Sequence, residues 1–333
     1  MYFLFLLLYV FFPGFFPGFG LGFGPGFFPE PRVQQPEIIG FAMVNGRTTG
    51  GKNGPVVRVS TLATFRAAAS STFPMTIRYS GNIKGKGFIN IKSDKTIIGE
   101  GGSSIEGIGL LIYGHHNVII RNMTIRNVVS YSNIVIKESA HHVWVDHCSL
   151  SSDRDHGWDY YDGLLDVGNK ADYVTLSWNK LHDNHKAMLI GFGDENTNDA
   201  GHLRVTVYKN YFYNNSERQP GVRFGQVHVI NNYIKDSSGY GIGSTMDATV
   251  RTDNNYFENA VQPIKTDFNA KPGYVSGGNS NVYRRSGKNT ISTGVCLWKP
   301  DYPYASRLLP VQEVPEAVRN GAGAKPNLLW NEK

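Results

Sequence analysis

Apolar and polar residues alternate in six similar segments along the middle of the chain. Each segment begins with valine, has Ile, Leu, Val or Thr two residues later, has Met, Cys or Asn at its sixth position, and ends in an apolar residue at its eighth. Alternation with a period of two is typical of β-strands, so each segment predicts strand structure on both sides of a bend. The segments span residues 118–125, 143–150, 174–181, 205–212, 227–234 and 250–257.

The starts of these segments are separated by 22–31 residues. A repeat of this length that tolerates insertions indicates a solenoid, in which each unit buries its apolar face against its neighbours. We therefore predict an all-β fold, a single-stranded right-handed parallel β-helix. An inward Asn at a bend can pair with turn backbone groups and with the next coil, so four sixth-position residues should form an internal ladder. These are Asn179, Asn210, Asn232 and Asn255.

The two ends of the chain differ from this middle part. Residues 1–12 form an apolar run about as long as a signal-peptide core, and a stretch rich in Gly, Pro and Phe follows. We expect residues 1–36 to be a signal peptide plus a low-complexity segment, and the protein to be secreted. The apolar run is too short to cross a bilayer core of roughly 30 Å, so no membrane partner is expected. The β-helix should occupy residues 37–297, with residues 298–333 packed on its outside.

Composition narrows the class of protein. Of the 333 residues, 41% are apolar and 18% are charged, which excludes a disordered chain and a membrane-spanning bundle. The net charge of +6 suits an acidic polysaccharide, whereas no Lys/Arg run exceeds two residues and no zinc-finger pattern occurs, so no nucleic acid partner is expected. The two cysteines, Cys148 and Cys296, could form one disulfide, although a buried free thiol is the simpler interpretation of Cys148.

A second set of predicted strands ends in glycine and spans residues 162–168, 186–191 and 220–225. When these strands are aligned on the final glycine, about 4.8 Å apart, charged residues of both signs fall on adjacent coils. A carboxylate beside the preceding bend, Asp146, faces outward in this reading and could join them. The predicted cluster contains Asp146, Asp162, Asp166, Lys186, Arg218 and Arg223. A ladder of surface salt bridges would use the same residue types, so the pattern alone leaves that alternative open.

The three carboxylates of this cluster are hard oxygen ligands of the kind that Ca²⁺ prefers. Along an ideal strand Asp162 and Asp166 would lie roughly 13 Å apart, too far to share one ion. Either Gly163 bends the chain or a bound substrate bridges the two carboxylates.

Five motifs follow one another in this part of the chain: WVDHCSLSSD at 144–153, DYYDGLLDV at 159–167, DYVTLSW at 172–178, HKAMLIG at 185–191 and RQPGVRFG at 218–225. In this order they resemble the pectate lyase family, in its fungal-type branch. The likeness covers residues 40–295. It implies β-elimination on polygalacturonate (pectate), the de-esterified form of pectin, with Ca²⁺ as cofactor.

The resemblance also implies roles for single residues. Arg218 falls on the catalytic arginine, while Lys186 and Arg223 fall on residues that bind galacturonate carboxylates. Lys186 would also stabilise the negative charge that develops during the reaction. Some members carry a further acidic ligand where this chain has Trp144. The implied calcium ligands are Asp146, Asp162 and Asp166.

Three other functions share features with the one that the resemblance implies. A pectin lyase would prefer methylated pectin and would not depend on calcium. A hydrolytic polygalacturonase would need carboxylates as acid and base around a water, which suits this mixed cluster less well. A β-helix could also bind cell-wall polysaccharide without cutting it. We expect a monomeric, calcium-dependent pectate lyase with an alkaline pH optimum.

Overall fold

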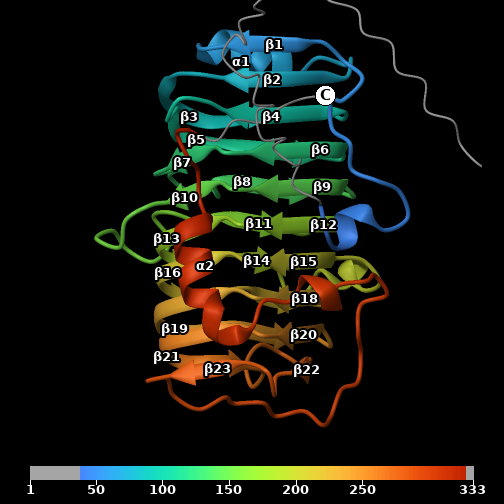
Figure 1. Cartoon of the computed structure of the whole chain (residues 1–333), viewed down its shortest axis with the longest axis vertical. Coiled ribbons are helices and arrows are strands. Elements are labelled where there is room, and N and C mark those ends of the chain that lie inside the picture. The colour runs from blue at the N-terminus through green and yellow to red at the C-terminus, as the bar shows by residue number, and fades with distance from the viewer. Residues whose placement is uncertain (1–37, 328–333) are drawn as a thin grey trace, which may run out of the picture. The chain divides into compact units, whose positions relative to one another are not determined.

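The computed structural model describes residues 38–327, which form a parallel β-helix, as predicted (Figure 1). The strands belong to two parallel sheets that run the length of the column. The ten-stranded sheet contains β1 (Val56–Val59), β2 (Met75–Tyr79), β4 (Lys95–Gly99), β6 (His116–Arg121), β9 (His141–Asp146), β12 (Asp172–Ser177), β15 (Arg204–Tyr208), β18 (Gln226–Ile230), β20 (Thr249–Asp253) and β22 (Tyr274–Gly277).

In the thirteen-stranded sheet, the coils towards each end of the column carry one long strand. In the coils between them, a loop divides this strand into two short ones. Continuous strands are β3 (Asn82–Asn90), β5 (Ser104–Tyr113), β19 (Tyr233–Thr245) and β21 (Tyr256–Lys265), and β23 (Val282–Arg284) ends the sheet. The broken pairs are β7 (Thr124–Arg126) with β8 (Ile134–Lys137), β10 (Ser149–Ser151) with β11 (Leu165–Val167), β13 (Lys180–Lys186) with β14 (Leu189–Ile190), and β16 (Tyr211–Glu217) with β17 (Gly221–Arg223).

The interior of the column is mainly apolar, and the predicted asparagine ladder is confirmed at the bend after the ten-stranded sheet. A second buried pair, Asn184 and Asn215, lies in β13 and β16 of the other sheet. The Asn210 Oδ1 atom accepts hydrogen bonds from the backbone N–H of Asn179 at 2.9 Å and from its side-chain amide at 3.0 Å. The same pattern repeats from Asn232 to Asn255. The ladder continues to Asn281, which the six aligned segments do not include.

The N-terminal end of the column is covered by α1 (Leu62–Ala69), which begins with a capping box at Thr61. Phe65 of this helix is buried and stacks on Tyr79, with ring centroids 5.1 Å apart. A solenoid needs such a cap because its first coil otherwise exposes the apolar interior.

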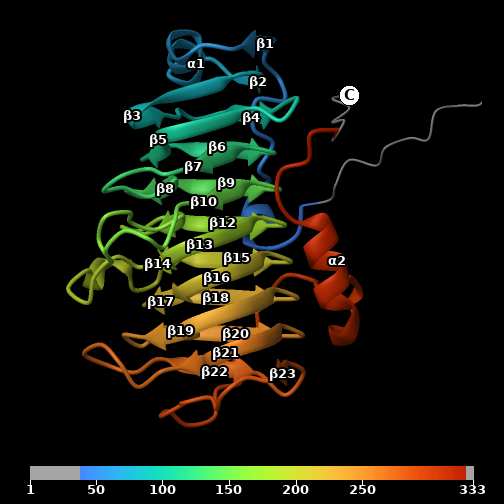
Figure 2. The ribbon, with the colours of Figure 1, turned by 90° about the vertical axis from the view of Figure 1, so that its left-hand side faces the viewer.

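The C-terminal segment packs on the outside of the column, as predicted (Figure 2). It contains α2 (Val314–Gly321), whose Val314 and Val318 are buried against tyrosines of β16, β19 and β21. The short 3₁₀ turns of the described chain are η1 (Phe41–Met43), η2 (Thr197–Asp199), η3 (Ala305–Arg307) and η4 (Val311–Glu313).

Both cysteines are free thiols, with Cys148 fully buried, so the two do not pair. Within residues 38–327 no helix is long and apolar enough to span a membrane. The segment 1–36, which we expect to contain a signal peptide, lies outside the described residues.

Candidate active site

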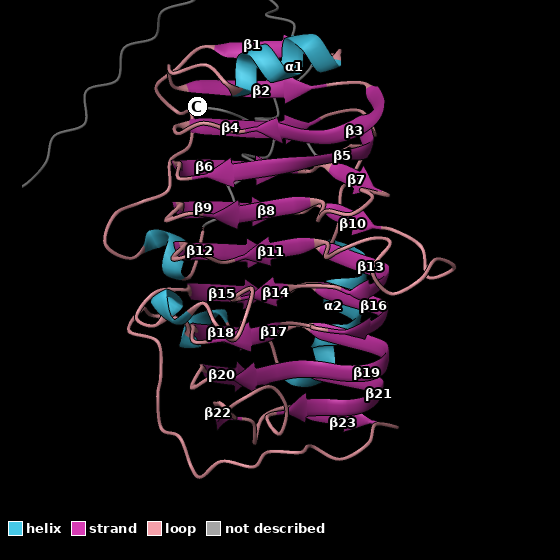
Figure 3. Cartoon of the chain, turned by 180° about the vertical axis from the view of Figure 1, so that it is seen from behind, coloured by secondary structure: helices cyan, strands magenta, loops and turns pink. Residues whose placement is uncertain are grey.

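The charged residues gather where the strands of the thirteen-stranded sheet are interrupted. Figure 3 shows β8, β11, β14 and β17 stacked one below another, with the interruptions beside them. Lys186 ends β13, and only 8% of its side chain is exposed. Its ammonium lies 2.9 Å from Asp159 and 3.3 Å from Asp162, both of which belong to the loop between β10 and β11. An ammonium on one coil therefore faces carboxylates on the coil before it.

Asp166 lies in β11 and is almost fully buried. Its carboxylate accepts hydrogen bonds from the Ser132 hydroxyl at 2.5 Å and from the Leu189 backbone N–H at 2.7 Å. Burial, together with the negative charge of Asp162, raises the pKa of Asp166 to about 7. A buried carboxylate with a raised pKa favours the binding of a cation nearby, because the positive charge stabilises the ionised form of the carboxylate.

The chain bends at Gly163, as the separation of Asp162 and Asp166 required. A Cβ atom at Gly163 would lie only 2.2 Å from an Asp166 carboxylate oxygen, so a larger residue could not occupy this position without moving that carboxylate. Residues 162–164 lie outside β11, which begins at Leu165. The two carboxylates are thus brought together by a loop and not along one strand.

Arg218 follows β16 on the next coil and contributes a guanidinium to the same surface. Its Nε atom lies 3.3 Å from a Glu217 carboxylate oxygen, and burial raises the pKa of Glu217. The positive charge of Arg218 also acts on Asp166, where it lowers the pKa against the larger effect of burial. Glu217 of β16 is level with Lys186 of β13, so Arg218 lies one residue beyond the level of Lys186 on the neighbouring coil.

Arg223 lies farther along β17 than the alignment on glycine predicts. The register pairs Leu189 with Gly221 and Ile190 with Val222, which shifts Arg223 away from the level of Asp166 and towards Gly191. The Arg223 guanidinium donates to Asp194 at 2.6 Å and to the Gly191 carbonyl at 3.1 Å. The prediction failed because Gly191 is level with Arg223 and not with Gly225, so alignment on the final glycines displaces β17 by two residues.

The expectation that Asp146 joins this cluster is wrong. Asp146 ends β9 in the ten-stranded sheet, is buried, and contacts Arg121, His147 and Ser177. Trp144 of the same strand is also buried, and its indole N–H donates to Ser177. Spacing along the sequence gives the coil on which a residue lies, but a bend separates β9 from the loop that carries Asp162.

Several residues of the site were missed from the sequence. Asp159 lies in the DYYDG motif, and its contact with Lys186 could have been predicted from that proximity. Ser132 precedes β8 and faces Asp166 only because β8 and β11 pair in register. Glu217 directly precedes Arg218, and Asp194 lies in the loop after β14. The ion pairs of Glu217 with Arg218 and of Asp194 with Arg223 depend on loop geometry.

The donor set at this cluster consists of oxygen atoms from Asp162, Asp166 and Ser132, close to two cations. Among the described residues, no group of three or more His, Cys, Asp or Glu side chains is arranged to hold a metal ion. A hard cation would therefore need further oxygen ligands from a substrate or from water. The arrangement suits a substrate that is itself an acid, since Lys186 and Arg218 could each bind a carboxylate.

Comparison with known proteins agrees with the fold and with this chemistry. The chain matches the pectate lyase family model over residues 33–327. It is 48% identical over 224 residues to a probable pectate lyase B from Aspergillus flavus, a match covering 66% of this chain and 68% of that protein. It is 37% identical over 297 residues to a pectate trisaccharide-lyase from Bacillus licheniformis, covering 85% of each chain.

A solved structure resembles the described fold closely. The crystal structure of a pectate lyase from Bacillus sp. N165 in complex with trigalacturonate aligns with a TM-score of 0.74 and 28% identity, covering 86% of this chain and 99% of that one. Pectate lyase II from Xanthomonas campestris gives the same TM-score at 25% identity, covering 88% of this chain and 100% of that one.

Proposed function

Since this chain belongs to the pectate lyase family and is a polysaccharide lyase, we propose that it cleaves polygalacturonate by calcium-dependent β-elimination at the cluster around Lys186. The observation that carries the proposal is the meeting of Asp162 and Asp166 with Lys186 and Arg218 on adjacent coils. A polyuronate presents a carboxylate on every sugar, which is the group that such a mixed cluster recognises.

The residues present fit a calcium ion in their chemistry and would supply part of its ligand set. The oxygens of Asp162, Asp166 and Ser132 are hard ligands, and the raised pKa of Asp166 indicates a carboxylate whose charge lacks compensation. Calcium takes six to eight oxygens, so water and the substrate carboxylates would supply the rest. Asp146, which the resemblance suggested as a third ligand, is left out because it lies in the other sheet.

In the reaction a base removes the C5 proton of a galacturonate, the C4–O bond breaks, and a double bond forms between C4 and C5. The leaving oxygen then takes up a proton. We assign the base to Arg218, which must first lose its own proton, and this loss requires alkaline conditions. Lys186 stabilises the charge that develops on the adjacent carboxylate. A bound calcium ion would act there as a Lewis acid.

The Glu217 carboxylate lies 3.3 Å from the Arg218 Nε atom and holds the guanidinium at the end of β16. The alkaline working range that we propose follows from the high intrinsic basicity of a guanidinium.

The test is the ultraviolet absorbance of the unsaturated product, followed with polygalacturonate at alkaline pH. We expect a rise that a chelator abolishes and that added calcium restores. Arg218→Lys should retain binding of the polymer but lose most of the rate. No rise from folded protein, with or without calcium, would overturn the proposal.

Methylated pectin as substrate separates this function from that of a pectin lyase. A neutral ester forms no ion pair with Lys186 and offers calcium a weaker ligand, so the rate should fall as methylation increases. Equal rates on both substrates that resist the chelator would favour pectin lyase.

We also propose that the protein is secreted, because its polymeric substrate is too large to enter a cell intact. The test is activity in the culture medium of an expressing cell. Activity confined to the cells would contradict secretion.

A further inference from the structure

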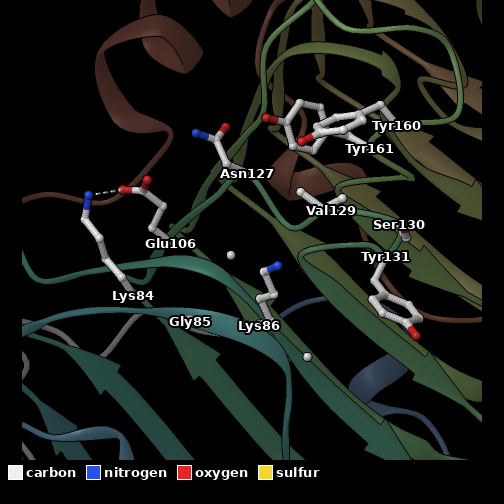
Figure 4. Close-up of a pocket in the computed structure, with 12 residues that line it drawn as sticks. Lys84, Gly85, Lys86, Glu106, Asn127, Val129, Ser130, Tyr131, Tyr160 and Tyr161 are labelled. Atoms are coloured by element: carbon white, nitrogen blue, oxygen red, sulfur yellow. Dashed lines mark ion pairs between the residues drawn. The ribbon is translucent and has the colours of Figure 1, made fainter.

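A cavity of about 590 Å³ opens on the thirteen-stranded sheet, towards the N-terminal end from the cluster around Lys186. Figure 4 shows its walls, which come from β3, from the segment 127–131 and from the loop between β10 and β11. The residues that matter for its chemistry are Lys84, Lys86, Glu106, Tyr131 and Tyr160. None of the roles proposed above uses this cavity.

The cavity and the reaction cluster share walls. The loop residues Asp159 and Asp162 contact Lys186, whereas Tyr160, which lies between them in sequence, lines the cavity. The Tyr160 carbonyl accepts a hydrogen bond from the Ser130 N–H at 2.9 Å, two residues before the Ser132 that contacts Asp166. In the sheet, β5 is separated from β11 only by β8, a distance of about 10 Å. One linear polymer could therefore occupy both places.

Lys86 is the cation that this cavity offers to a ligand. A bulge in β3 between Lys84 and Gly87 sets two residues of this strand against one of β5, and such bulges redirect side chains. Lys84 forms an ion pair with Glu106 at 3.2 Å, which Figure 4 marks with a dashed line. Glu106 is also neutralised by Arg126 at 2.9 Å. Lys86 is exposed and forms no ion pair or hydrogen bond with the described residues.

The cavity also presents aromatic surface. Tyr131 and Tyr160 are 50% and 42% exposed, so both rings are open to contact with a ligand. Tyr131 is held by Phe88, at 4.9 Å between centroids, and Tyr160 by His156, at 4.0 Å. Both rings are thus fixed before a ligand arrives, which reduces the entropy lost on binding.

We propose that this cavity is an accessory binding site for a further uronate of the same polymer, with its carboxylate on Lys86 and its ring against Tyr131 and Tyr160. The proposal rests on the proposed function, which supplies the polyuronate. The site binds a sugar that does not react, so it lowers KM for chains long enough to reach it and leaves kcat unchanged.

The test compares Lys86→Glu with Lys288→Glu on galacturonate oligomers of increasing length. Lys288 is also exposed and forms no ion pair with the described residues, but it follows β23 at the far end of the sheet. Loss of a charge-assisted hydrogen bond should raise KM about tenfold for long substrates. The shortest cleaved oligomers should show no change, and Lys288→Glu should match the wild type at every length. Lys86→Met, which keeps the apolar stem, should give a smaller effect in the same direction.

An equal change in KM at all lengths, or none at any length, would overturn the accessory site. The wild type is assayed first, so that an absence of unsaturated product identifies failure of the lyase function itself. In that case calorimetric titration of polygalacturonate into wild type and Lys86→Glu still tests the cavity. Weaker binding by the variant alone supports the site, and equal binding refutes it.

Discussion

The asparagine ladder allows the cost of one substitution to be worked out from the structure. Asn210 lies in its middle and is fully buried. Its amide donates to the Leu176 carbonyl at 2.9 Å and to Asn232 Oδ1 at 3.0 Å, and its carbonyl accepts both N–H groups of Asn179 described above. Asn210→Ala removes all of these bonds and keeps the backbone ones, in which the Asn210 N–H donates to Asn232 Oδ1 at 2.8 Å and its backbone carbonyl accepts from the Tyr233 N–H at 3.0 Å.

Three buried polar groups would then lack their partner: the backbone N–H of Asn179, one of its side-chain N–H groups, and the Leu176 carbonyl. Each unsatisfied buried group costs about 1–3 kcal/mol, so the total is about 3–9 kcal/mol. A water molecule that enters the space left by the amide would bring the cost towards the lower figure. Since whole domains are stable by only about 5–15 kcal/mol, even this lower figure is large.

The assay is chemical denaturation followed by circular dichroism, supported by thermal melts. We expect Asn210→Ala to lower the unfolding free energy by at least about 3 kcal/mol. Asn289→Ala is the matched control, because Asn289 is exposed and forms no side-chain hydrogen bond with the described residues. Asn210→Ala with the stability of the control would refute the idea that the ladder holds this bend.

Three further predictions concern single groups. Glu217→Gln removes a negative charge beside Arg218, so the variant should repel the carboxylates of polygalacturonate less and show a lower KM, and an unchanged or higher KM would contradict this. Burial lowers the pKa of His228 below its ordinary 6.5, so the unfolded chain binds a proton more readily. The unfolding free energy of the wild type, relative to that of His228→Gln, should therefore fall below pH 6.5 by up to about 1.4 kcal/mol per pH unit. The raised pKa of Asp166 acts in the opposite direction but is common to both proteins, so a constant difference between them would refute the prediction. Burial raises the pKa of Cys148 to about 12, so a thiol reagent should modify Cys296 alone until the protein is denatured; two reactive thiols in native protein would argue against this burial.

The repeat could be predicted from the sequence because a solenoid is built from local rules. Every coil places a valine-led strand, a bend and an inward sixth residue in the same order, so periodicity alone identifies the β-helix and its ladder. Asn281 was missed because its coil begins with Val275, level with Val250, but carries Gly277 at the third position and one extra residue before the bend, which moves the Asn to the seventh position. Its side-chain carbonyl still accepts from the Asn255 N–H. The outside packing of the C-terminal segment followed from the loss of the repeat.

The site was harder to predict because loops, and not the repeat, build it. The bend at Gly163 could be inferred from the distance that separates two carboxylates along a strand. The register of Arg223 and the sheet in which Asp146 lies could not, since both depend on turns whose geometry the spacing does not contain. Motif letters identify residues that occur together in a family, but only the fold shows which of them share a surface.

Two of the three bends of each coil, the one after the ten-stranded sheet and the one that interrupts the thirteen-stranded sheet, divide stability from chemistry. At the first bend the buried asparagines pair with backbone groups of neighbouring coils, which leaves them no freedom to contact a ligand. At the second, the strands break, and polar side chains such as Asn184 and Asp166 satisfy the backbone groups that the break frees, Asn184 bonding to the Asp162 carbonyl and Asp166 to the Leu189 N–H. Charged side chains can therefore reach the surface there without opening the core. If this division holds, Asn210→Ala should destabilise the protein while the folded fraction keeps the wild-type kcat.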